Sequence, residues 1–315
     1  VFTNCATSAF SFLLFYLLLN GSGVGRAYDD DLMVTDWRKM PTVYVAIDDD
    51  HEDRFKTDNG KPVIDNDIHS VAWFERQFAR GLIKSPEQKV TIFTVPDSRG
   101  GWAKAVELIE RMAFEGRGDE IVILDFSKVR GKDQPIKGMQ YRPSSGPAPV
   151  MAALAKIASI KLRNYEPWLA TMFVDHYLSE CVLVGGARRA ARMACKSWRD
   201  ETIFDFIAIK REHALWSSNN SVSIDEEFRA AVKKVVGLLK DMKDIKPGTS
   251  AAEMNVTGLA SDGVITATEL HAYKVLIAVA HASYFDGTGE PGLINQDRLH
   301  ANTAGVEDYL DGMFA

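Results

Sequence analysis

The sequence predicts a mixed α/β fold, and three short apolar runs carry this prediction. Residues 42–48, 89–95 and 120–126 are rich in β-branched residues and have the length of strands. Between the second and third runs, Trp102 and Val106 begin an apolar stripe at helical spacing. Strands that are followed by helices favour the α/β class.

Six further segments are expected to be helices. The apolar run at residues 9–19 is too short to cross a bilayer, so we expect a buried core helix there. Ser223 with Glu226, and Thr266 with Glu269, match the capping box that precedes a helix. The other three expected helices span residues 150–162, 171–183 and 201–210.

Three segments between these elements are expected to be connections. Residues 49–69 are polar and acidic, which is typical of an exposed connection, and residues 130–149 indicate a loop rich in Gly, Pro and Lys. The pattern GSGVG at residues 21–25 indicates a turn after the first helix, or a place where a ligand approaches the backbone closely. A dinucleotide-binding fingerprint is disfavoured there, because that motif follows a strand.

Composition indicates a globular protein that binds neither nucleic acid nor a membrane. The 315 residues are 46% hydrophobic and 25% charged, which suits one large domain or two smaller ones. A net charge of -6 excludes a global basic field for nucleic acid. Three cysteines are too few for a disulfide framework, so we expect a reducing, cytoplasmic compartment. The start at Val1, directly before apolar sequence, leads us to expect a fragment.

The segment LVGGARRAARMA at residues 183–194 has the character of an anion-binding loop. Its two glycines allow close backbone approach, and its three arginines carry planar, permanently charged groups that suit phosphate. The alternative is a helix start with solvated arginines. The residues concerned are Gly185, Gly186, Arg188, Arg189 and Arg192.

Two other polar segments suit nucleotide recognition. The loop at residues 136–149 combines basic and small hydroxyl residues just before a helix, which describes a phosphate cradle or an ordinary capped loop. Asn219 and Asn220 carry donors and acceptors for polar recognition, or they are turn residues. The candidates in the loop are Lys137, Arg142, Ser144, Ser145 and Gly146.

Cysteine and histidine give weak signals by themselves. Cys5 is either a buried apolar residue or a functional thiol. The seven histidines show no metal-ligand spacing, so no metal site is predicted, and His176 beside Asp175 is expected to be structural.

Six stretches follow one another in a distinctive order. They are NCA with GSGVG at 4–25, VPDSRGGW at 95–102, DFSKVRGKDQPIKG with SSGPAP at 125–149, ECVLVGGARRAARMA at 180–194, LWSSNNSV at 215–222 and TGEPGLINQDRL at 288–299. Together they resemble the catalytic subunit of ribonucleotide reductases, and most closely the adenosylcobalamin-dependent class II enzymes. GGARRAAR, SGPAP and the ordered set are specific, whereas GSGVG alone is weak.

The resemblance implies a fold and an activity. The family's fold is a ten-stranded α/β barrel of two parallel halves, of which residues 1–315 would supply roughly the first half, with a class-specific insertion at about 26–120. The activity is the reduction of ribonucleotides to deoxyribonucleotides for DNA synthesis. A thiyl radical takes the 3′-hydrogen of the ribose and the 2′-hydroxyl leaves as water. A thiol pair supplies the electrons and becomes a disulfide.

The resemblance also implies ligands and residue roles. It implies adenosylcobalamin as cofactor, a deoxynucleotide or ATP as effector, and a thioredoxin-type reductant, in a monomer or a homodimer. Cys5 matches one of the two reducing thiols. Residues matched to the substrate nucleotide are Asn4, Gly21, Gly23, Gly25, Asn219 and Asn220. Residues matched to the two specificity loops near the effector are Lys137, Ser144, Ser145, Gly146, Gly185, Gly186, Arg188 and Arg189.

The sequence departs from the family in one important respect. The radical-bearing cysteine of the family lies in an Asn-Pro-Cys-Gly-Glu-like motif that this sequence lacks, so residues 1–315 alone are expected to be inactive. Cys181 and Cys195 match no redox position. Two alternatives stay open, a nucleotide-binding module without catalysis and the large subunit of an iron-dependent class I reductase. The choice between di- and triphosphate substrates is also open.

Overall fold

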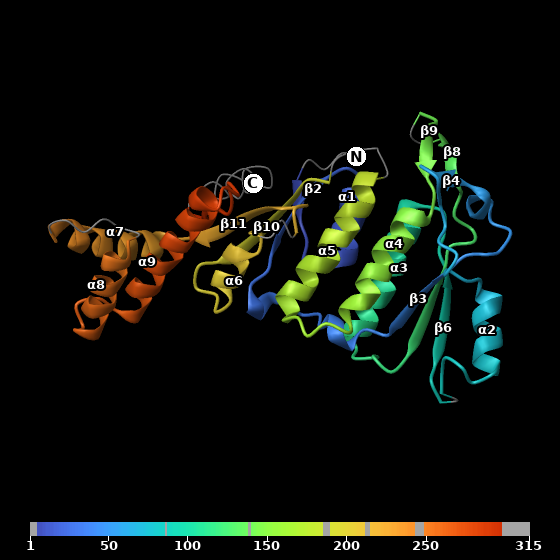
Figure 1. The fold of residues 1–315 in the computed structure, drawn as a ribbon, viewed down its shortest axis with the longest axis horizontal. Helices are drawn as coiled ribbons and strands as arrows, with labels where there is room; N and C mark the ends of the chain where they lie inside the picture. Colours follow the sequence, from blue (N-terminus) through green and yellow to red (C-terminus); the bar gives the residue numbers. More distant parts are fainter. Residues whose placement is uncertain are drawn as a thin grey trace, which may run out of the picture. The chain divides into compact units, whose positions relative to one another are not determined.

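The computed structural model confirms the α/β class. It describes residues 5–85, 87–137, 140–184, 190–211, 215–242 and 249–297. The chain divides into two compact units, Val1–Met193 and Ala194–Ala315. Strands and helices alternate in both units (Figure 1). The closing of a ten-stranded barrel stays an expectation from the resemblance.

A three-stranded parallel sheet forms one part of the first unit. Its order is β3 (Thr42–Ala46), β7 (Ile121–Asp125) and β6 (Val90–Thr94), and all three strands lie where the sequence predicts them. The central strand β7 is buried along its whole length, as expected for a parallel strand that is covered on both faces.

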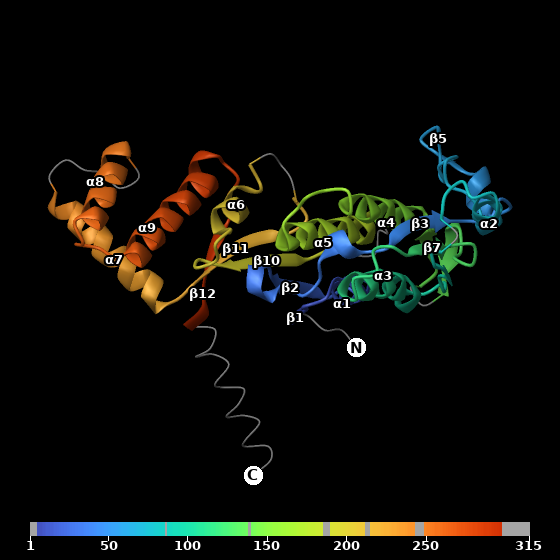
Figure 2. The ribbon, with the colours of Figure 1, turned by 90° about the horizontal axis from the view of Figure 1, so that it is seen from below.

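Helices cover both faces of this sheet because alternate side chains of β7 point to opposite sides. On one side, Ile121 and Ile123 pack with Phe74 of α2 (Val71–Ala79). On the other side, Val122 and Leu124 join the main core of the unit. That core also includes residues of α1 (Ser11–Leu19), α3 (Arg99–Phe114), α4 (Ala148–Ile160) and α5 (Pro167–Val184), and α4 and α5 run side by side in both views (Figure 1 and Figure 2).

A second set of parallel strands begins at the N-terminus. β1 (Cys5–Thr7) pairs with β2 (Gly23–Ala27). Beside β2, the amide of Val24 donates to the carbonyl of Ala191 at 2.9 Å, just before β10 (Arg192–Ser197) begins. The prediction of a turn over the whole of GSGVG is therefore wrong, because the turn ends at Gly21 and Gly23 already lies in a strand.

Two predicted connections contain regular structure. The segment 49–69 holds the short helix η3 (Glu52–Phe55) and the hairpin of β4 (Thr57–Asp58) with β5 (Lys61–Pro62), and its Asp53 is fully buried. The segment 130–149 holds the antiparallel hairpin of β8 (Lys132–Ile136) and β9 (Arg142–Ser145). Two short helices, η1 (Asp30–Leu32) and η2 (Trp37–Lys39), precede β3.

The second unit combines a parallel strand pair with a helical cluster. β11 (Asn219–Ile224) pairs with β12 (Gly292–Asn295), and α6 (Ile203–Ala208) lies between β10 and β11 in sequence. The cluster consists of α7 (Glu226–Asp241), α8 (Ser250–Ser261) and α9 (Ala267–Ala280), followed by the π-helical turn η5 (His281–Phe285) (Figure 2).

The two predicted capping boxes have different outcomes. Thr266 and Glu269 form the box, with reciprocal hydrogen bonds of 3.1 and 2.8 Å. Ser223 does not cap α7, because it lies within β11. Asp225 caps that helix instead, and its carboxylate accepts the amide of Phe228 at 2.9 Å.

Candidate functional site

The strand pair β1 and β2 places Cys5 beside the glycines of GSGVG. Cys5 is in register with Gly23, and Thr7 is in register with Gly25. A Cβ atom at Gly25 would meet only ordinary contacts, the nearest being Met193 Cε at 3.9 Å. Packing within the fold therefore leaves room for a methyl group at this strand position. Asn4 lies outside the described residues, and Gly21 ends the turn after α1 with a φ of 81°.

A second thiol of this unit is chemically inert. Cys181 is buried in α5, and burial raises the pKa of its thiol to about 12. A thiol that stays protonated at neutral pH is a poor nucleophile and a poor partner for disulfide exchange. This agrees with the expectation that Cys181 has no redox role.

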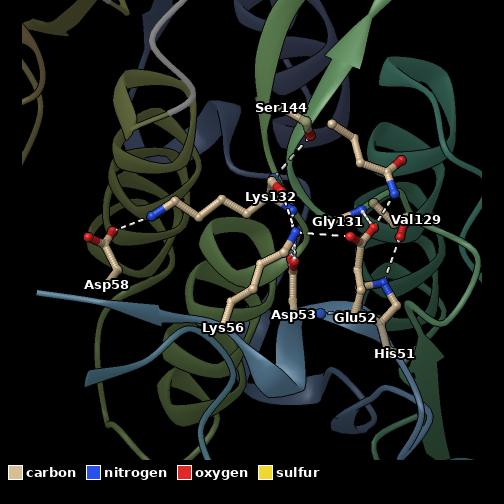
Figure 3. Close-up of polar contacts among 11 residues, drawn as sticks. His51, Glu52, Asp53, Lys56, Asp58, Val129, Gly131, Lys132 and Ser144 are labelled. Atoms are coloured by element: carbon tan, nitrogen blue, oxygen red, sulfur yellow. Dashed lines mark hydrogen bonds and ion pairs between the residues drawn. The ribbon is translucent and has the colours of Figure 1, made fainter. Parts of the chain in front are cut away.

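The hairpin β8–β9 is held at its base by the buried carboxylate of Asp53 (Figure 3). Both oxygens of Asp53 accept the backbone amide of Lys132, at 2.8 and 2.9 Å, and Lys56 Nζ lies 3.0 Å from the same carboxylate. The His51 ring bonds to the carbonyl of Val129 at 2.8 Å and accepts the amide of Asp53 at 3.2 Å. We call His51, Asp53, Lys56 and Lys132, together with Glu52, the hairpin anchor.

Charge pairing strengthens the hairpin anchor at its exposed side. Glu52 accepts the amide of Gly131 at 3.1 Å and lies 3.0 Å from Lys56 Nζ. The hydrogen bond from Lys56 lowers the pKa of Glu52. Burial alone would lower the pKa of Lys56, but its hydrogen bonds to Asp53 and Glu52 outweigh burial and raise that pKa. Lys132 Nζ pairs with Asp58 in the neighbouring hairpin. These ion pairs and hydrogen bonds fix the base of β8 and β9.

The predicted phosphate residues lie at this hairpin. Gly146 has a φ of 70°, and a Cβ there would collide with the Asp53 carboxylate and with Lys132 N at 2.8 Å. Ser144 is buried and accepts the amide of Gly146 at 3.0 Å, while Ser145 donates weakly to the Gly146 carbonyl at 3.4 Å. Lys137 is exposed beyond the end of β8. The glycine is required by the anchor, which sequence reasoning did not detect.

A buried polar cluster beneath α5 was also missed by the sequence analysis. Arg26 pairs with Asp175 at 3.0 Å, and Tyr28 donates to the same carboxylate oxygen at 2.6 Å. Burial works against the charge on Arg26, but Asp175 raises the pKa of the guanidinium above its usual value. Arg192 is also buried, and none of its three guanidinium nitrogens has a hydrogen-bond partner within the described part of the chain. Val24, Arg26 and Tyr28 alternate along β2 and the residue after it, and all three are buried on one side. This alternation in the sequence could have indicated that Arg26 is buried.

The segment GGARRAAR at residues 185–192 lies mostly outside the described residues. Gly185, Gly186, Arg188 and Arg189 lie outside the described residues. Arg192, the third arginine of that motif, begins a strand and is 4% exposed. A helix start with solvated arginines is therefore wrong for Arg192.

In the second unit, the predicted asparagines differ in their surroundings. Asn219 is exposed at the start of β11, whereas Asn220 is buried and its side-chain amide nitrogen has no partner among the residues that the structure describes. The backbone amide of Asn220 donates to Glu290 at 2.8 Å, and Glu290 pairs with Lys210 at 2.5 Å. This pairing ties the start of β11 to the turn before β12.

The same unit carries a groove of about 550 Å³ along α7. Its floor is apolar and includes Phe228, Val232 and Leu293. Below, this feature is called the α7 groove. No arrangement of three or more His, Cys, Asp or Glu in the described part of the chain could hold a metal ion. Among the described helices, none combines the length and apolar character needed to cross a membrane.

Comparisons with known proteins match the chain to one family. Residues 64–161 match the model of the insertion domain of B12-dependent ribonucleotide reductases. This range overlaps the expected insertion over residues 64–120. An adenosylcobalamin-dependent ribonucleoside-triphosphate reductase of Levilactobacillus brevis is 30% identical over 150 residues, and its counterpart of Lactobacillus delbrueckii subsp. bulgaricus is 28% identical over 232 residues. A provisionally named reductase of the same kind from Mycobacterium phage D29 is 28% identical over 240 residues.

Coverage of these relatives is partial. The matches cover 44% to 70% of this chain but only 20% to 32% of the relatives, so the chain spans at most about a third of their length. A crystal structure of a B12-dependent class II ribonucleotide reductase aligns with a TM-score of 0.47 and 22% identity, over 72% of this chain and 30% of that one. The chain is thus similar to adenosylcobalamin-dependent ribonucleotide reductases over up to 70% of its length, and residues 64–161 match the insertion domain of that family.

Proposed function

We propose that this chain is part of an enzyme that reduces ribonucleoside triphosphates to deoxyribonucleotides. The match of residues 64–161 to the insertion domain, the similarity to the named reductases and the register of Cys5 with Gly23 support the proposal. The choice of triphosphates follows the names of the relatives. The enzyme would work in the cytoplasm with a thioredoxin-type reductant.

Cys5 supplies one of the two reducing thiols in this proposal. The two thiols donate two electrons and two protons, the 2′-hydroxyl leaves as water, and the sulfurs join in a disulfide. The glycine at position 23, in register with Cys5, has no side chain to keep a ribose away from the strand. Asn4, Gly21, Gly25, Asn219 and Asn220 bind the substrate nucleotide in the same proposal.

The hairpin β8–β9 serves as the first effector loop. The hairpin anchor fixes its base, and Lys137 is exposed and has no ion-pair partner among the described residues. A lysine in this state is available for a phosphate group. The second loop, with Gly185, Gly186, Arg188 and Arg189, would communicate between effector and substrate. Lys137→Ala should weaken effector binding without lowering the melting temperature, whereas Lys128→Ala, also exposed, should change neither.

Adenosylcobalamin is the cofactor that the similarity to these reductases implies. When bound, it supplies the radical that starts the reaction. Its corrin ring is edged by amides, which need both donors and acceptors from a protein. The side chains that line the α7 groove are apolar or cationic and offer no acceptor, so they do not fit the cofactor. No step of the proposed chemistry is therefore assigned to a contact between this chain and the cofactor.

A direct assay tests the proposal. The intact protein, given a ribonucleoside triphosphate, adenosylcobalamin and a dithiol, should release the deoxynucleotide. Product that forms without adenosylcobalamin but requires an iron-containing partner protein would indicate a class I subunit instead. Nucleotide binding without any product would indicate a binding module.

A further inference from the structure

The helix α7 presents two apolar faces, and among the described residues of its unit only one of these faces is packed. Val235 and Leu239 pack in the core that α7 shares with α8 and α9. The second face is the α7 groove, to which Val232 and Val236 contribute. A second apolar stripe on a helix needs a second partner to remove it from water.

The shape of the α7 groove suits another helix. Gly237 lies in it, and a Cβ atom at this position would meet no described residue within 4 Å. A glycine in the middle of a helix costs stability relative to alanine, so an empty space beside it indicates a reason other than packing within the unit. Small residues allow the backbone of a second helix to approach closely.

The edge of the α7 groove is basic. Lys233 and Lys240 line it, and neither has an ion-pair partner among the described residues. On the other side of the same helix, Lys234 pairs with Glu269 of α9 at 2.9 Å. An occupant of the groove should therefore carry acidic groups beside its apolar stripe.

The sequence of this chain contains such a segment at residues 304–315, which lie outside the described part. Val306, Tyr309, Leu310 and Met313 recur at the spacing of one helical face. The acidic residues Glu307, Asp308 and Asp311 are interleaved with them. The pattern predicts an acidic amphipathic helix.

The chain approaches the α7 groove just before this segment. Leu293 of β12 lines the groove, and Asp297 lies 3.4 Å from Arg229, another lining residue. Eight residues lie between Asp297 and Val306, and the nine steps from one Cα to the next can span up to about 30 Å. The groove stripe from Arg229 to Lys240 is about 16 Å long, because a helix rises 1.5 Å per residue.

We propose that residues 304–315 dock as a helix in the α7 groove, with their apolar stripe against Phe228, Val232 and Val236. In this arrangement the acidic residues of the segment pair with Lys233 and Lys240. The proposal does not depend on the enzymatic activity, since it rests on the groove and its charges. The docked segment would shield the second apolar face of α7 from water.

Lysine footprinting tests this docking in the full chain. Dilute acetic anhydride is added, and the acetylation rates of Lys233, Lys240 and Lys274 are measured by mass spectrometry. Removal of residues 304–315 should raise the rates at Lys233 and Lys240 about tenfold if nine in ten molecules are docked. Lys274, exposed on α9 and outside the groove, is the internal control and should not change.

A second variant separates docking from any other effect of deleting residues 304–315. Asp308→Asn with Asp311→Asn keeps the apolar stripe but removes two charges, and it should raise the same two rates part of the way. Equal rates in the full and shortened chains would overturn the proposal. Protection that disappears on dilution would overturn it in favour of a second copy of the chain as the occupant.

Discussion

The carboxylate of Glu110 on α3 accepts the backbone amide of Ser11 at the first turn of α1, at 2.9 Å. It also accepts the amide of Phe12 at 2.9 Å. α1 has no side-chain cap and no acidic residue in its first turn, so its cap comes from a distant helix. Burial raises the pKa of Glu110 to about 7, although the two amides and Arg26 act in the opposite direction.

This pKa makes folding stability depend on pH. The folded chain holds the Glu110 proton more tightly than the unfolded chain, whose carboxyl titrates near 4.5. The contribution of the group is therefore complete below pH 4.5 and is lost as the pH rises to 7, by about 3 kcal/mol. Glu110→Gln should remove this slope from urea unfolding curves measured between pH 4.5 and 7. An unchanged slope in the variant would show that Glu110 titrates normally.

The buried pair of Arg26 and Asp175 should be the most costly ion pair to break in the first unit. Asp175→Asn leaves Arg26 without its anion and should lower the free energy of unfolding by about 3–5 kcal/mol. The exposed pair of Lys156 and Glu180, at 2.9 Å, gives the control. Lys156→Gln should cost less than about 1 kcal/mol. Similar losses in the two variants, measured by chemical unfolding, would contradict this assignment.

The two glycines at the start of α3 should respond differently to the same substitution. A Cβ at Gly101 would collide with the backbone of Pro96, whereas a Cβ at Gly100 would meet only Ser98 Oγ at 4.0 Å. Gly101→Ala should therefore destabilise the protein by about 1–3 kcal/mol. Gly100→Ala should be neutral or stabilising by up to about 1 kcal/mol, because alanine favours helix. Thermal unfolding of the two variants gives the comparison, and equal melting temperatures would refute it.

Substitution of Gly25 should weaken substrate binding without lowering the stability of the fold. A methyl group there meets only contacts of 3.9 Å or more, so Gly25→Ala should keep the melting temperature. If a nucleotide approaches β2, the methyl should raise KM roughly tenfold, or about 1.4 kcal/mol of binding free energy. Gly258→Ala on α8, where a Cβ would also meet nothing within 4 Å, is the control and should change neither quantity. An unaltered KM for Gly25→Ala would argue against substrate contact at β2.

The sequence predicted those elements whose signals are local. The strands at β3, β6 and β7 were found because β-branched runs mark them, and the capping box of Thr266 and Glu269 because both partners lie within one turn. The box expected at Ser223 failed for a related reason. Asp225, two residues later, caps the helix through the amide of Phe228, and spacing alone does not show which residue ends the strand.

The missed features depend on partners that are distant in the sequence. The segment 49–69 looked like an exposed connection, yet Asp53 is buried because it binds Lys132, seventy-nine residues away. Glu110 and Arg26 also have their partners across the unit. The candidate site could be predicted from the sequence only as a set of motifs, because no single segment contains the contacts that hold the hairpin or the buried cluster.

The function of Cys5 is the central claim, and one comparison tests it most directly. Deoxynucleotide formation by the intact protein is measured with adenosylcobalamin and thioredoxin, for Cys5→Ser and for the control Cys195→Ser. The account predicts that Cys5→Ser abolishes thioredoxin-dependent turnover, whereas Cys195→Ser keeps it. Full turnover by Cys5→Ser would contradict the account.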